Sequence, residues 1–568
     1  MAENPLKPLD RFWKLLANDK KLIGNIYVYS IFNGLIALTL PLGIQAIVNL
    51  IQGARVSTSW VVLVMLVVFG VLVSGALRIF QLRITENIQR KLFTRAAMEF
   101  SFRISRIRLE SLFGHYAPEL MNRFFDINTV QKVLPKILID FSSAVFLTIF
   151  SLILLSFYHP FFIAFGFFLL ILIFIIIRYM APQGLLTSLE ESKYKYKVAH
   201  WLEELSRTFV SFKLAGNTMF PLERTNDLLE YYLNARAKHF KILVRQYWLL
   251  VLFKVIITAG LLFIGGVLVF EQQMNIGQFI AAEIIIIIVL ASVEKLILTL
   301  DSIYDILTSL EKIGYVTDME LEHEKGLELS PKKGIHIELR DISFSYPRTG
   351  KNTLNNVSTD FPPGSINIIT GRNGSGKSTL LYVTAGLYEL QSGTILYNEM
   401  PLRNFSFSST RKVIGEYLLS DKLFEGTIKE NITLGRRHLD IEDVVWAIEK
   451  AGLNEFVKNL PDGFESKILT EGVGLPDSVT HKLLIARCIV GNPKLLVFDN
   501  IFDLLDKKDA MEIIDFLCAP EHDWTIVAIT DIRYFAQKAD KIVVMEKGRL
   551  KKEGSFDDVK DDIELKSW

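Results

Sequence analysis

Six stretches of about 20 consecutive apolar residues occupy most of the first half of this chain. A helix rises about 1.5 Å per residue, so about 20 apolar residues are needed to cross a bilayer core about 30 Å thick. Backbone that faces lipid must satisfy its own hydrogen bonds, which favours helices for all six runs. The predicted spans are residues 23–51, 60–80, 137–158, 161–180, 247–270 and 276–298.

The charge between the spans predicts their orientation. The turns at 52–59, 159–160 and 271–275 are short, whereas the segments 83–136 and 181–245 are long and rich in Lys and Arg. Because basic segments stay on the cytosolic side, we expect both long segments and both termini in the cytosol. Helical periodicity predicts that the long segments continue the membrane helices beyond the bilayer, with turns near 114–118 and 216–221. The alternative is six helices joined by ordinary soluble loops.

The composition changes near Lys332. The charged stretch 320–334 is predicted to be a linker, and the runs after it are short, β-rich and alternate with helical patterns. We therefore expect an all-α six-helix transmembrane domain at 1–319, a linker at 320–334 and an α/β domain with a largely parallel sheet at 335–568.

Composition excludes some functions. Half of the 568 residues are apolar (50%), and the formal net charge of +1 argues against a nucleic-acid partner. Two cysteines, Cys488 and Cys518, make neither a disulfide framework nor a metal cluster.

A phosphate-binding loop is the most specific motif. Residues 371–378 fit G-x-x-x-x-G-K-[ST] between a predicted strand and a predicted helix. Glycines let backbone N–H groups turn toward phosphate oxygens, and the helix N-terminus adds positive charge. Lys377 is predicted to reach the β- and γ-phosphates of ATP, and the Ser378 hydroxyl to ligate Mg²⁺. A glycine-rich turn without a ligand is the alternative. The predicted nucleotide-binding residues are Gly371, Arg372, Asn373, Gly374, Ser375, Gly376, Lys377, Ser378 and Thr379.

A second motif, which ends in an acidic residue, follows the phosphate-binding loop at the distance expected for this class of ATPase. Residues 494–499 read K-L-L-V-F-D, a buried strand that ends in Asp499. A carboxylate at this place is suited to holding Mg²⁺.

With these two motifs, the chain resembles the ABC exporters over nearly its whole length. Phe344-Ser345-Tyr346-Pro347 looks like the start of the family's nucleotide-binding domain, which implies that Tyr346 stacks on adenine; an ordinary strand tyrosine is the alternative. Residues 423–432 match the segment after the family's Q-loop, and Asp506 closes the D-loop at 503–506. Residues 471–475 and 274–281 resemble exporters of bacterial toxins, bacteriocins and peptides.

Three catalytic positions depart from the family pattern. The residue after Asp499, normally a glutamate, is Asn500, and the switch histidine is replaced by Asp531. The Q-loop glutamine falls at Leu419. The resemblance implies that these positions orient water, contact the γ-phosphate and ligate Mg²⁺, so the substitutions predict weak hydrolysis.

The signature that grips the partner subunit's ATP is also altered. Pro476 removes a backbone N–H, and Asp477 adds a negative charge beside a phosphate. We expect both composite sites that this chain helps to form to be weakened. In place of L-S-G-G-Q the chain has Leu475, Pro476, Asp477, Ser478 and Val479.

Two charged residues lie inside predicted spans. Glu283, in the sixth span, is predicted either to line a translocation path or to make an interhelical hydrogen bond. Lys254, in the fifth, is expected to extend its ammonium toward the interface.

Two functions are compatible with these patterns. The resemblance implies an ATP-binding half-transporter in a bacterial cytoplasmic (inner) membrane, in contact with lipid. It would work as a homodimer or with a competent second half-transporter, export a peptide, protein or other amphiphile, and engage a periplasmic adaptor. The second function is an ATP-binding pseudo-transporter that serves as a scaffold or regulator of a membrane complex.

Overall fold

The computed structural model describes residues 8–52, 58–347, 350–562 and 565, and divides into two compact units. The first unit comprises residues 1–105 and 115–319, and the second comprises 106–114 and 320–568. The chain therefore contributes the short segment Arg106–Gly114, from the middle of the helical half, to the second unit.

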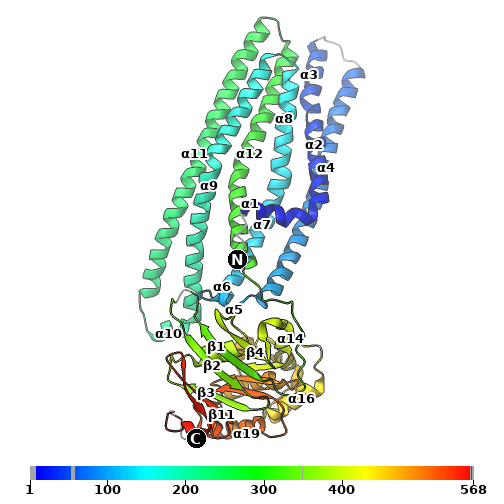
Figure 1. The fold of residues 1–568 in the computed structure, drawn as a ribbon. Coiled ribbons are helices and arrows are strands. Elements are labelled where there is room, and N and C mark those ends of the chain that lie inside the picture. The colour runs from blue at the N-terminus through cyan, green and yellow to red at the C-terminus, as the bar shows by residue number, and fades with distance from the viewer. Residues whose placement is uncertain (1–7, 53–57, 348–349, 563–564, 566–568) are drawn as a thin grey trace. The chain divides into compact units, whose positions relative to one another are not determined.

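The first unit is helical, and its described residues contain six helical segments long and apolar enough to cross a membrane, as predicted (Figure 1). Four of its helices are 42 to 51 residues long. At about 1.5 Å per residue they exceed the thickness of a bilayer core about twofold. The prediction of helices that continue beyond the membrane is confirmed, and the alternative of soluble loops is wrong. The helices are α1 (Pro8–Leu16), α2 (Lys20–Ala37), α3 (Thr39–Gln52), α4 (Thr58–Ile104), α6 (Ala117–Met121), α7 (Asp126–Pro135), α8 (Ser142–Ser156), α9 (Phe161–Arg207), α10 (Phe209–Leu214), α11 (Phe220–Phe270) and α12 (Ile276–Thr317).

The first predicted span is interrupted at Leu38, between α2 and α3. Pro41 follows three residues later and has no N–H to donate to the carbonyl of Ala37. The loss of that hydrogen bond explains why one apolar run forms two helices.

The turns predicted near 114–118 and 216–221 lie between described helices, whereas residues 53–57 of the turn predicted at 52–59 lie outside the described residues. Gly114 and Gly216 both have a positive φ, 79° and 77°, which permits the chain to reverse. Asn275 begins α12 with a capping box: its side chain accepts from the N–H of Gln278, whose side chain accepts from the N–H of Asn275.

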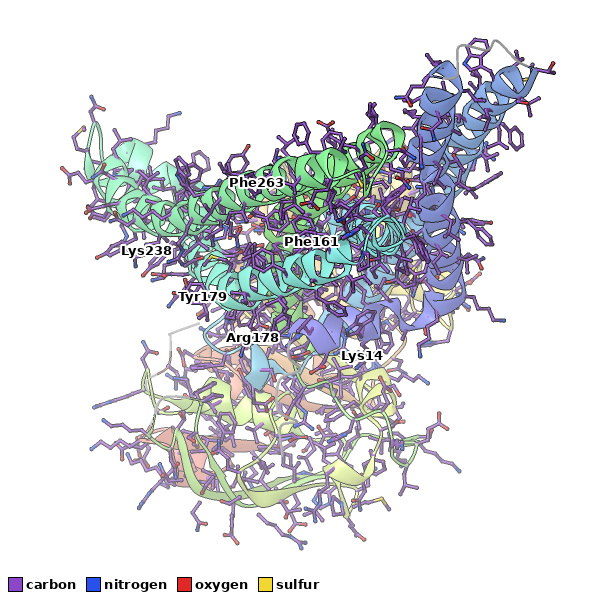
Figure 2. The ribbon with its side chains drawn as sticks, turned by 90° about the horizontal axis from the view of Figure 1, so that it is seen from above. Lys14, Phe161, Arg178, Tyr179, Lys238 and Phe263 are labelled. Atoms are coloured by element: carbon purple, nitrogen blue, oxygen red, sulfur yellow. The ribbon has the colours of Figure 1, made fainter. Side chains whose placement is uncertain are left out.

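Packing inside the first unit centres on α12. The ring of Tyr304 lies against Gly184 of α9, where a Cβ would come within 2.3 Å of that ring. Gln246 of α11 donates a hydrogen bond of 2.9 Å to the Tyr304 hydroxyl. Outward-facing side chains are large and apolar, as expected for a lipid-facing surface: Phe263 on α11 is 76% exposed and Tyr179 on α9 is 59% exposed (Figure 2).

The second unit is an α/β domain, as predicted. Its main sheet has the order β12-β11-β3-β10-β9-β6, in which all neighbours except β11 and β12 are parallel. A smaller antiparallel sheet has the order β2-β1-β4-β5. The strands are β1 (Ile337–Phe344), β2 (Leu354–Phe361), β3 (Ile366–Gly371), β4 (Ser392–Tyr397), β5 (Met400–Pro401), β6 (Ile414–Tyr417), β9 (Leu495–Asp499), β10 (Thr525–Ile529), β11 (Lys541–Glu546) and β12 (Arg549–Gly554), with a short pair β7 (Gly426–Thr427) and β8 (Lys467–Ile468) outside both sheets.

Helices cover the parallel sheet, and the strand ends position the motifs. Because β3, β10 and β9 are adjacent and parallel, the residues that follow them meet at one edge of the sheet. The helices used below are α5 (Leu109–Leu112), α13 (Lys377–Thr384), α15 (Ile428–Thr433), α18 (Asp477–Ile489) and α19 (Lys507–Leu517).

Candidate functional site

The phosphate-binding loop joins β3 to α13. Gly371 has φ 142°, and a Cβ there would lie 2.2 Å from the carbonyl oxygen of Met545 on the neighbouring strand. Gly376, at φ 101°, is the N-cap of α13. Both positions require glycine, so the loop can curl tightly around the start of α13, whose first N–H groups have no acceptor within the helix.

Two polar groups of the loop fit an anionic ligand. The Ser375 hydroxyl oxygen is buried and has no hydrogen-bond partner among the described residues. The Lys377 ammonium donates to the carbonyl of Gly371 and, at 3.2 Å, to that of Arg372, so it lies across the loop it belongs to. An orphaned hydroxyl, a lysine at the mouth and a helix N-terminus form a donor set suited to phosphate oxygens.

Ser378 and Asp499 are brought together, as expected for a metal site. The Ser378 hydroxyl donates to one carboxylate oxygen of Asp499 at 3.4 Å, and the Tyr382 hydroxyl donates to the other at 3.1 Å. Burial raises the pKa of Asp499, and the two hydrogen bonds and the Lys377 charge oppose that rise. A hydroxyl and a carboxylate are oxygen ligands of the kind that Mg²⁺ prefers, so the residues fit that ion.

Sequence reasoning missed Tyr382. It follows Ser378 by four residues on α13, a spacing that places both side chains on the same helical face. That spacing is the signal by which it could have been found.

Tyr346 lies beside the phosphate-binding loop. Its hydroxyl forms a hydrogen bond of 2.9 Å with the Thr379 hydroxyl. Phe344 and Tyr388 contact its ring in T-shaped geometry, and the Phe113 ring stacks on it at 5.3 Å and 20°. Phe113 is 233 residues away in sequence and no local pattern identifies it.

The segment that carries Phe113 is held by several polar contacts within the second unit. The N–H of Arg108 donates to the carbonyl of Glu320, and its guanidinium pairs with the carboxylates of Glu320 and Glu389. The N–H of Glu389 in turn donates to Glu110, whose pKa is raised by burial. These contacts fix α5 and the adjoining Phe113 against the domain.

Asn500 and Asp531 follow β9 and β10 at the same sheet edge. Asn500 has φ 51°, its N–H donates to the carbonyl of Ile529, and its side-chain oxygen is buried without a hydrogen-bond partner among the described residues. Asp531 lines a cavity of about 750 Å³ together with the loop residues Arg372 and Ser375. The two positions thus hold an amide and a carboxylate at the edge of the sheet where the phosphate-binding loop lies, in place of the glutamate and the histidine of the family pattern.

Leu419 follows β6, and the altered signature leads into α18; a hydrogen bond joins β6 to α18. Leu419 is 61% exposed. Pro476 is the N-cap of α18 and makes no side-chain capping hydrogen bond, and Asp477 occupies the first turn. The hydroxyl of Tyr417, at the end of β6, is hydrogen-bonded to the ring of His481 on α18.

The remaining predicted positions are placed as follows. Asp506 is the N-cap of α19. Glu283 is half-buried in α12 and has no hydrogen bond or ion pair within the described part of the chain, so the interhelical hydrogen bond is absent there. The ammonium of Lys254 pairs with Glu294 of α12 at 2.8 Å, a partner that the sequence did not indicate. Its extension toward the membrane interface stays a prediction.

Two family descriptions match the chain. Residues 23–293 match the ABC transporter transmembrane region, and residues 354–503 match the ABC transporter. Together these matches cover most of the polypeptide and coincide with the helical bundle and the α/β domain.

Curated relatives share one part of this chain. The leukotoxin translocation ATP-binding protein LktB of Mannheimia haemolytica is 31% identical over 294 residues, 52% of this chain and 41% of that protein. The alpha-hemolysin translocation ATP-binding protein HlyB of Escherichia coli O157:H7 is 29% identical over 52% of this chain and 42% of its own length. The ATP-dependent lipid A-core flippase of Xanthomonas campestris is 29% identical over 53% of this chain and 51% of its own length. The matched region thus spans about half, or less, of each of these relatives.

A solved structure matches this chain over more of its length than the curated relatives do. The structure of a bacterial Atm1-family ABC exporter with ATP bound covers 95% of this chain and is itself covered to 97%, with a TM-score of 0.82 and 18% identity. That likeness concerns the fold. The chain belongs to the ABC transporters, and its membrane region and ABC domain are fused in one polypeptide with the fold of an ABC exporter.

Proposed function

We propose that this chain is an ATP-binding subunit of a dimeric exporter whose own hydrolytic activity is severely impaired. One observation carries the proposal: a phosphate-binding loop with its lysine, serine and metal-binding carboxylate assembled lies beside two catalytic positions that hold the wrong side chains. Ser378 contacts Asp499, whereas the next residue is Asn500 and the neighbouring strand leads to Asp531.

The residues that would hold Mg-ATP are those of the loop together with Asp499 and Tyr346. Lys377, the N–H groups at the start of α13 and Ser375 would bind the phosphates, Ser378 and Asp499 would ligate Mg²⁺, and Tyr346 would stack on adenine. Mg²⁺, when bound, supplies charge neutralisation between the β- and γ-phosphates.

Hydrolysis requires groups that this site does not offer. An amide such as Asn500 cannot accept a proton from an attacking water at neutral pH. Asp531 would bring a negative charge toward the γ-phosphate, and Leu419 offers neither a metal ligand nor a hydrogen bond to water. In a dimer, Pro476 and Asp477 would face the partner's nucleotide and weaken that site as well.

The names of the relatives suggest a class of substrate and a direction of transport. Their names describe translocation of leukotoxin and alpha-hemolysin and flipping of lipid A-core. We extend this to a peptide, protein or other amphiphile that leaves the cytosol through a bacterial inner membrane, with both termini of this chain in the cytosol and a second half-transporter as partner. A periplasmic adaptor belongs to the same proposal. Glu283, half-buried and without an intrachain partner in the described residues, is the proposed polar contact of the translocation path.

A second function is favoured by the same altered residues. A chain that binds ATP but cannot turn it over would serve as a regulatory or scaffold subunit beside a competent partner. Co-purification separates the two: a half-transporter with an intact glutamate, histidine and signature supports export by a heterodimer, and a membrane complex of another class supports the scaffold.

Nucleotide binding is tested with the full chain in lipid nanodiscs. Mg-ATP is titrated into the wild type, Lys377→Ala and, as a matched control, Lys458→Ala, which changes an exposed lysine of the same domain. We expect strong weakening only in Lys377→Ala, and weakening of the wild type when EDTA removes Mg²⁺. Equal affinity in all three proteins would contradict the assignment of the loop.

A further inference from the structure

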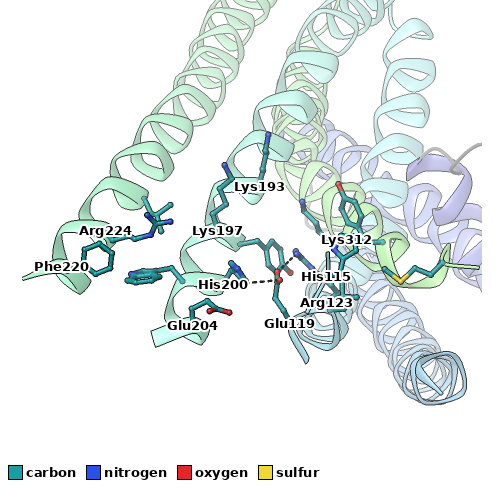
Figure 3. A pocket seen from close by; sticks show the side chains of 16 residues that line it. His115, Glu119, Arg123, Lys193, Lys197, His200, Glu204, Phe220, Arg224 and Lys312 are labelled. Carbon is teal, nitrogen blue, oxygen red and sulfur yellow. Dashed lines mark hydrogen bonds and ion pairs between the residues drawn. The ribbon is translucent and has the colours of Figure 1, made fainter. Parts of the chain in front are cut away.

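A cavity of about 760 Å³ opens in the helical unit between α6, α9, α11 and the end of α12 (Figure 3). All of its lining residues belong to the first unit, and none belongs to the nucleotide-binding motifs. The cavity therefore needs its own explanation.

The lining carries an excess of positive charge. Five residues that are cationic at neutral pH face two carboxylates, Glu119 and Glu204, and His115 and His200 add two titratable rings. The five cations are Arg123, Lys193, Lys197, Arg224 and Lys312.

Both carboxylates already have partners. Glu119 pairs with Arg123 at 3.1 Å and with the ring of His200 at 3.3 Å, and Glu204 pairs with Arg207, which does not line the cavity, at 2.6 Å. In the described part of the chain, the other four cations form no ion pair or hydrogen bond. Three of them, Lys197, Arg224 and Lys312, lie over aromatic rings. Four cations without ion-pair partners around one cavity repel one another, and an anion between them would relieve that repulsion.

The burial of Lys312 is the strongest evidence for an anion in this cavity. It is only 7% exposed, yet its ammonium has no carboxylate partner among the described residues. It lies 5.6 Å from the ring centre of Tyr196 and 5.2 Å from that of Tyr315. The buried carboxylate of Asp126 accepts a hydrogen bond from Tyr196 and forms no ion pair with Lys312. Burial lowers the pKa of Lys312, and the charges of Asp126 and Glu311 oppose that shift without forming an ion pair with it. A buried ammonium without a hydrogen-bonded acceptor is unfavourable, so an anion supplied from outside the chain would stabilise it.

Arg123 adds a second incomplete group. One of its terminal nitrogens pairs with Glu119, and its guanidinium lies 3.6 Å from the ring centre of Tyr196. Its Nε and Nη1 atoms are buried and have no hydrogen-bond partner among the described residues. The guanidinium is thus held in place with part of its donor capacity unused.

The other wall is aromatic. Trp201, Phe220 and Tyr315 line the cavity, and Trp201 packs edge-to-face against Phe220 with ring centres 6.0 Å apart. Flat apolar walls beside cations favour a ligand that has both a charged and a flat apolar part.

We propose that this cavity is a binding site for an amphiphilic organic anion, with a phosphate or carboxylate near Lys312 and a flat apolar body against Trp201 and Phe220. The shared chemistry can come from a soluble organic anion or from an anionic lipid headgroup. The site is separate from the nucleotide loop and does not depend on how well the chain hydrolyses ATP.

The test measures 1-naphthyl phosphate binding by fluorescence titration of the full dimeric protein in phosphatidylcholine nanodiscs. The background variant is Lys377→Ala, so that the phosphate-binding loop does not contribute. We expect saturable binding that weakens on the order of tenfold or more in Lys312→Met and in Lys197→Gln, because each removes a charged donor. Lys197 is exposed, so its variant folds even if Lys312→Met does not. Lys241→Gln, an exposed lysine of α11 that does not line the cavity, is the matched control and should bind as before.

Further titrations test whether binding needs the anionic group, whether it needs the aromatic ring, and whether the natural anion is a lipid. 1-Naphthol, which lacks the anion, and inorganic phosphate, which lacks the ring, should each bind at least tenfold more weakly than 1-naphthyl phosphate. The Lys241→Gln protein is then titrated in nanodiscs that contain phosphatidylglycerol. Weaker binding of 1-naphthyl phosphate than in phosphatidylcholine would identify the natural anion as a lipid headgroup, and equal binding would identify it as a soluble anion. Absence of saturable binding, which is the result expected if the second subunit fills the cavity, would overturn the proposal. Equal affinity in Lys312→Met, Lys197→Gln and Lys241→Gln would overturn it too.

Discussion

The ring of Phe113 stacks on the ring of Tyr346, with their centres 5.3 Å apart and their planes 20° from parallel. Tyr346 is the residue proposed to stack on adenine, and Phe113 comes from the segment between α5 and α6. One face of the adenine platform is thus already occupied by a side chain of the same polypeptide.

Phe113→Ala should strengthen ATP binding by a few-fold. An adenine that stacks on this face must displace the phenyl ring, and an aromatic pair contributes about 0.5–1.5 kcal/mol beyond its buried area. The measurement is the Mg-ATP dissociation constant of the chain in nanodiscs.

A double-mutant cycle supplies the control for this competition. In a Tyr346→Ala background, Phe113→Ala should leave ATP affinity unchanged, because there is no platform left to compete for. Weaker ATP binding in Phe113→Ala alone would show instead that Phe113 supports the tyrosine while the base uses its other face.

The affinity for Mg-ATP should fall as the solution becomes acidic. Burial raises the pKa of Asp499 above its usual 3.8, and only the ionised carboxylate ligates Mg²⁺. Affinity should therefore drop as pH decreases through the raised pKa, and Asp499→Asn should bind weakly with a flatter profile.

Without Mg²⁺, the raised pKa of Asp499 should make the folded state more stable at low pH, which is the opposite of its effect on Mg-ATP affinity. A carboxyl group with a raised pKa in the folded state stabilises that state below its unfolded pKa, and this contribution disappears as pH rises through the folded pKa. Thermal unfolding with EDTA, compared between the wild type and Asp499→Asn across this range, measures it. A wild-type pH profile identical to that of Asp499→Asn would exclude a perturbed Asp499.

The ion pair between Lys254 and Glu294 should stabilise the helical unit. Removing one partner leaves a charge uncompensated between helices, so Lys254→Ala and Glu294→Ala should each lower the melting temperature. The double variant should lose less than the sum of the single losses. Additive losses would mean that the two side chains do not interact in the membrane.

The orientation is tested with single cysteines. A cysteine at Gln272, in the exposed turn between α11 and α12, should react in intact cells with an impermeant maleimide, and one at Asn217, in the exposed turn before α11, should react only after lysis. The native background is low because Cys488 is buried and burial raises the pKa of the Cys518 thiol to about 12. The reverse pattern would place the termini outside the cytosol.

The sequence predicts the architecture well because its signals are local. Apolar runs set the six helical segments, glycines at 114 and 216 mark the reversals, and a loop between β3 and α13 marks the phosphate site. The pairing of Ser378 with Asp499 follows from strands that end at one sheet edge.

The unpredicted features depend on contacts between distant segments. Nothing near Phe113 indicates Tyr346, and nothing near Lys254 indicates Glu294, because each pair is brought together by the packing of separate elements. The break at Leu38 was missed since the apolar run continues through it, and only Pro41 marks it. The roles of Asn500, Asp531 and the altered signature remain predictions, since they concern chemistry on a bound nucleotide.

Steady-state ATPase activity of the purified chain in lipid tests the central claim most directly, with Lys377→Ala as the blank. Loss of a water-orienting group or a charge-stabilising donor commonly lowers the rate on the order of 10²–10³-fold. We expect turnover that far below the usual enzyme median of about 10 per second, with little recovery in Asn500→Glu, because Asp531 and the altered signature remain. Turnover of about 1 to 10 per second that disappears in Lys377→Ala would contradict the account.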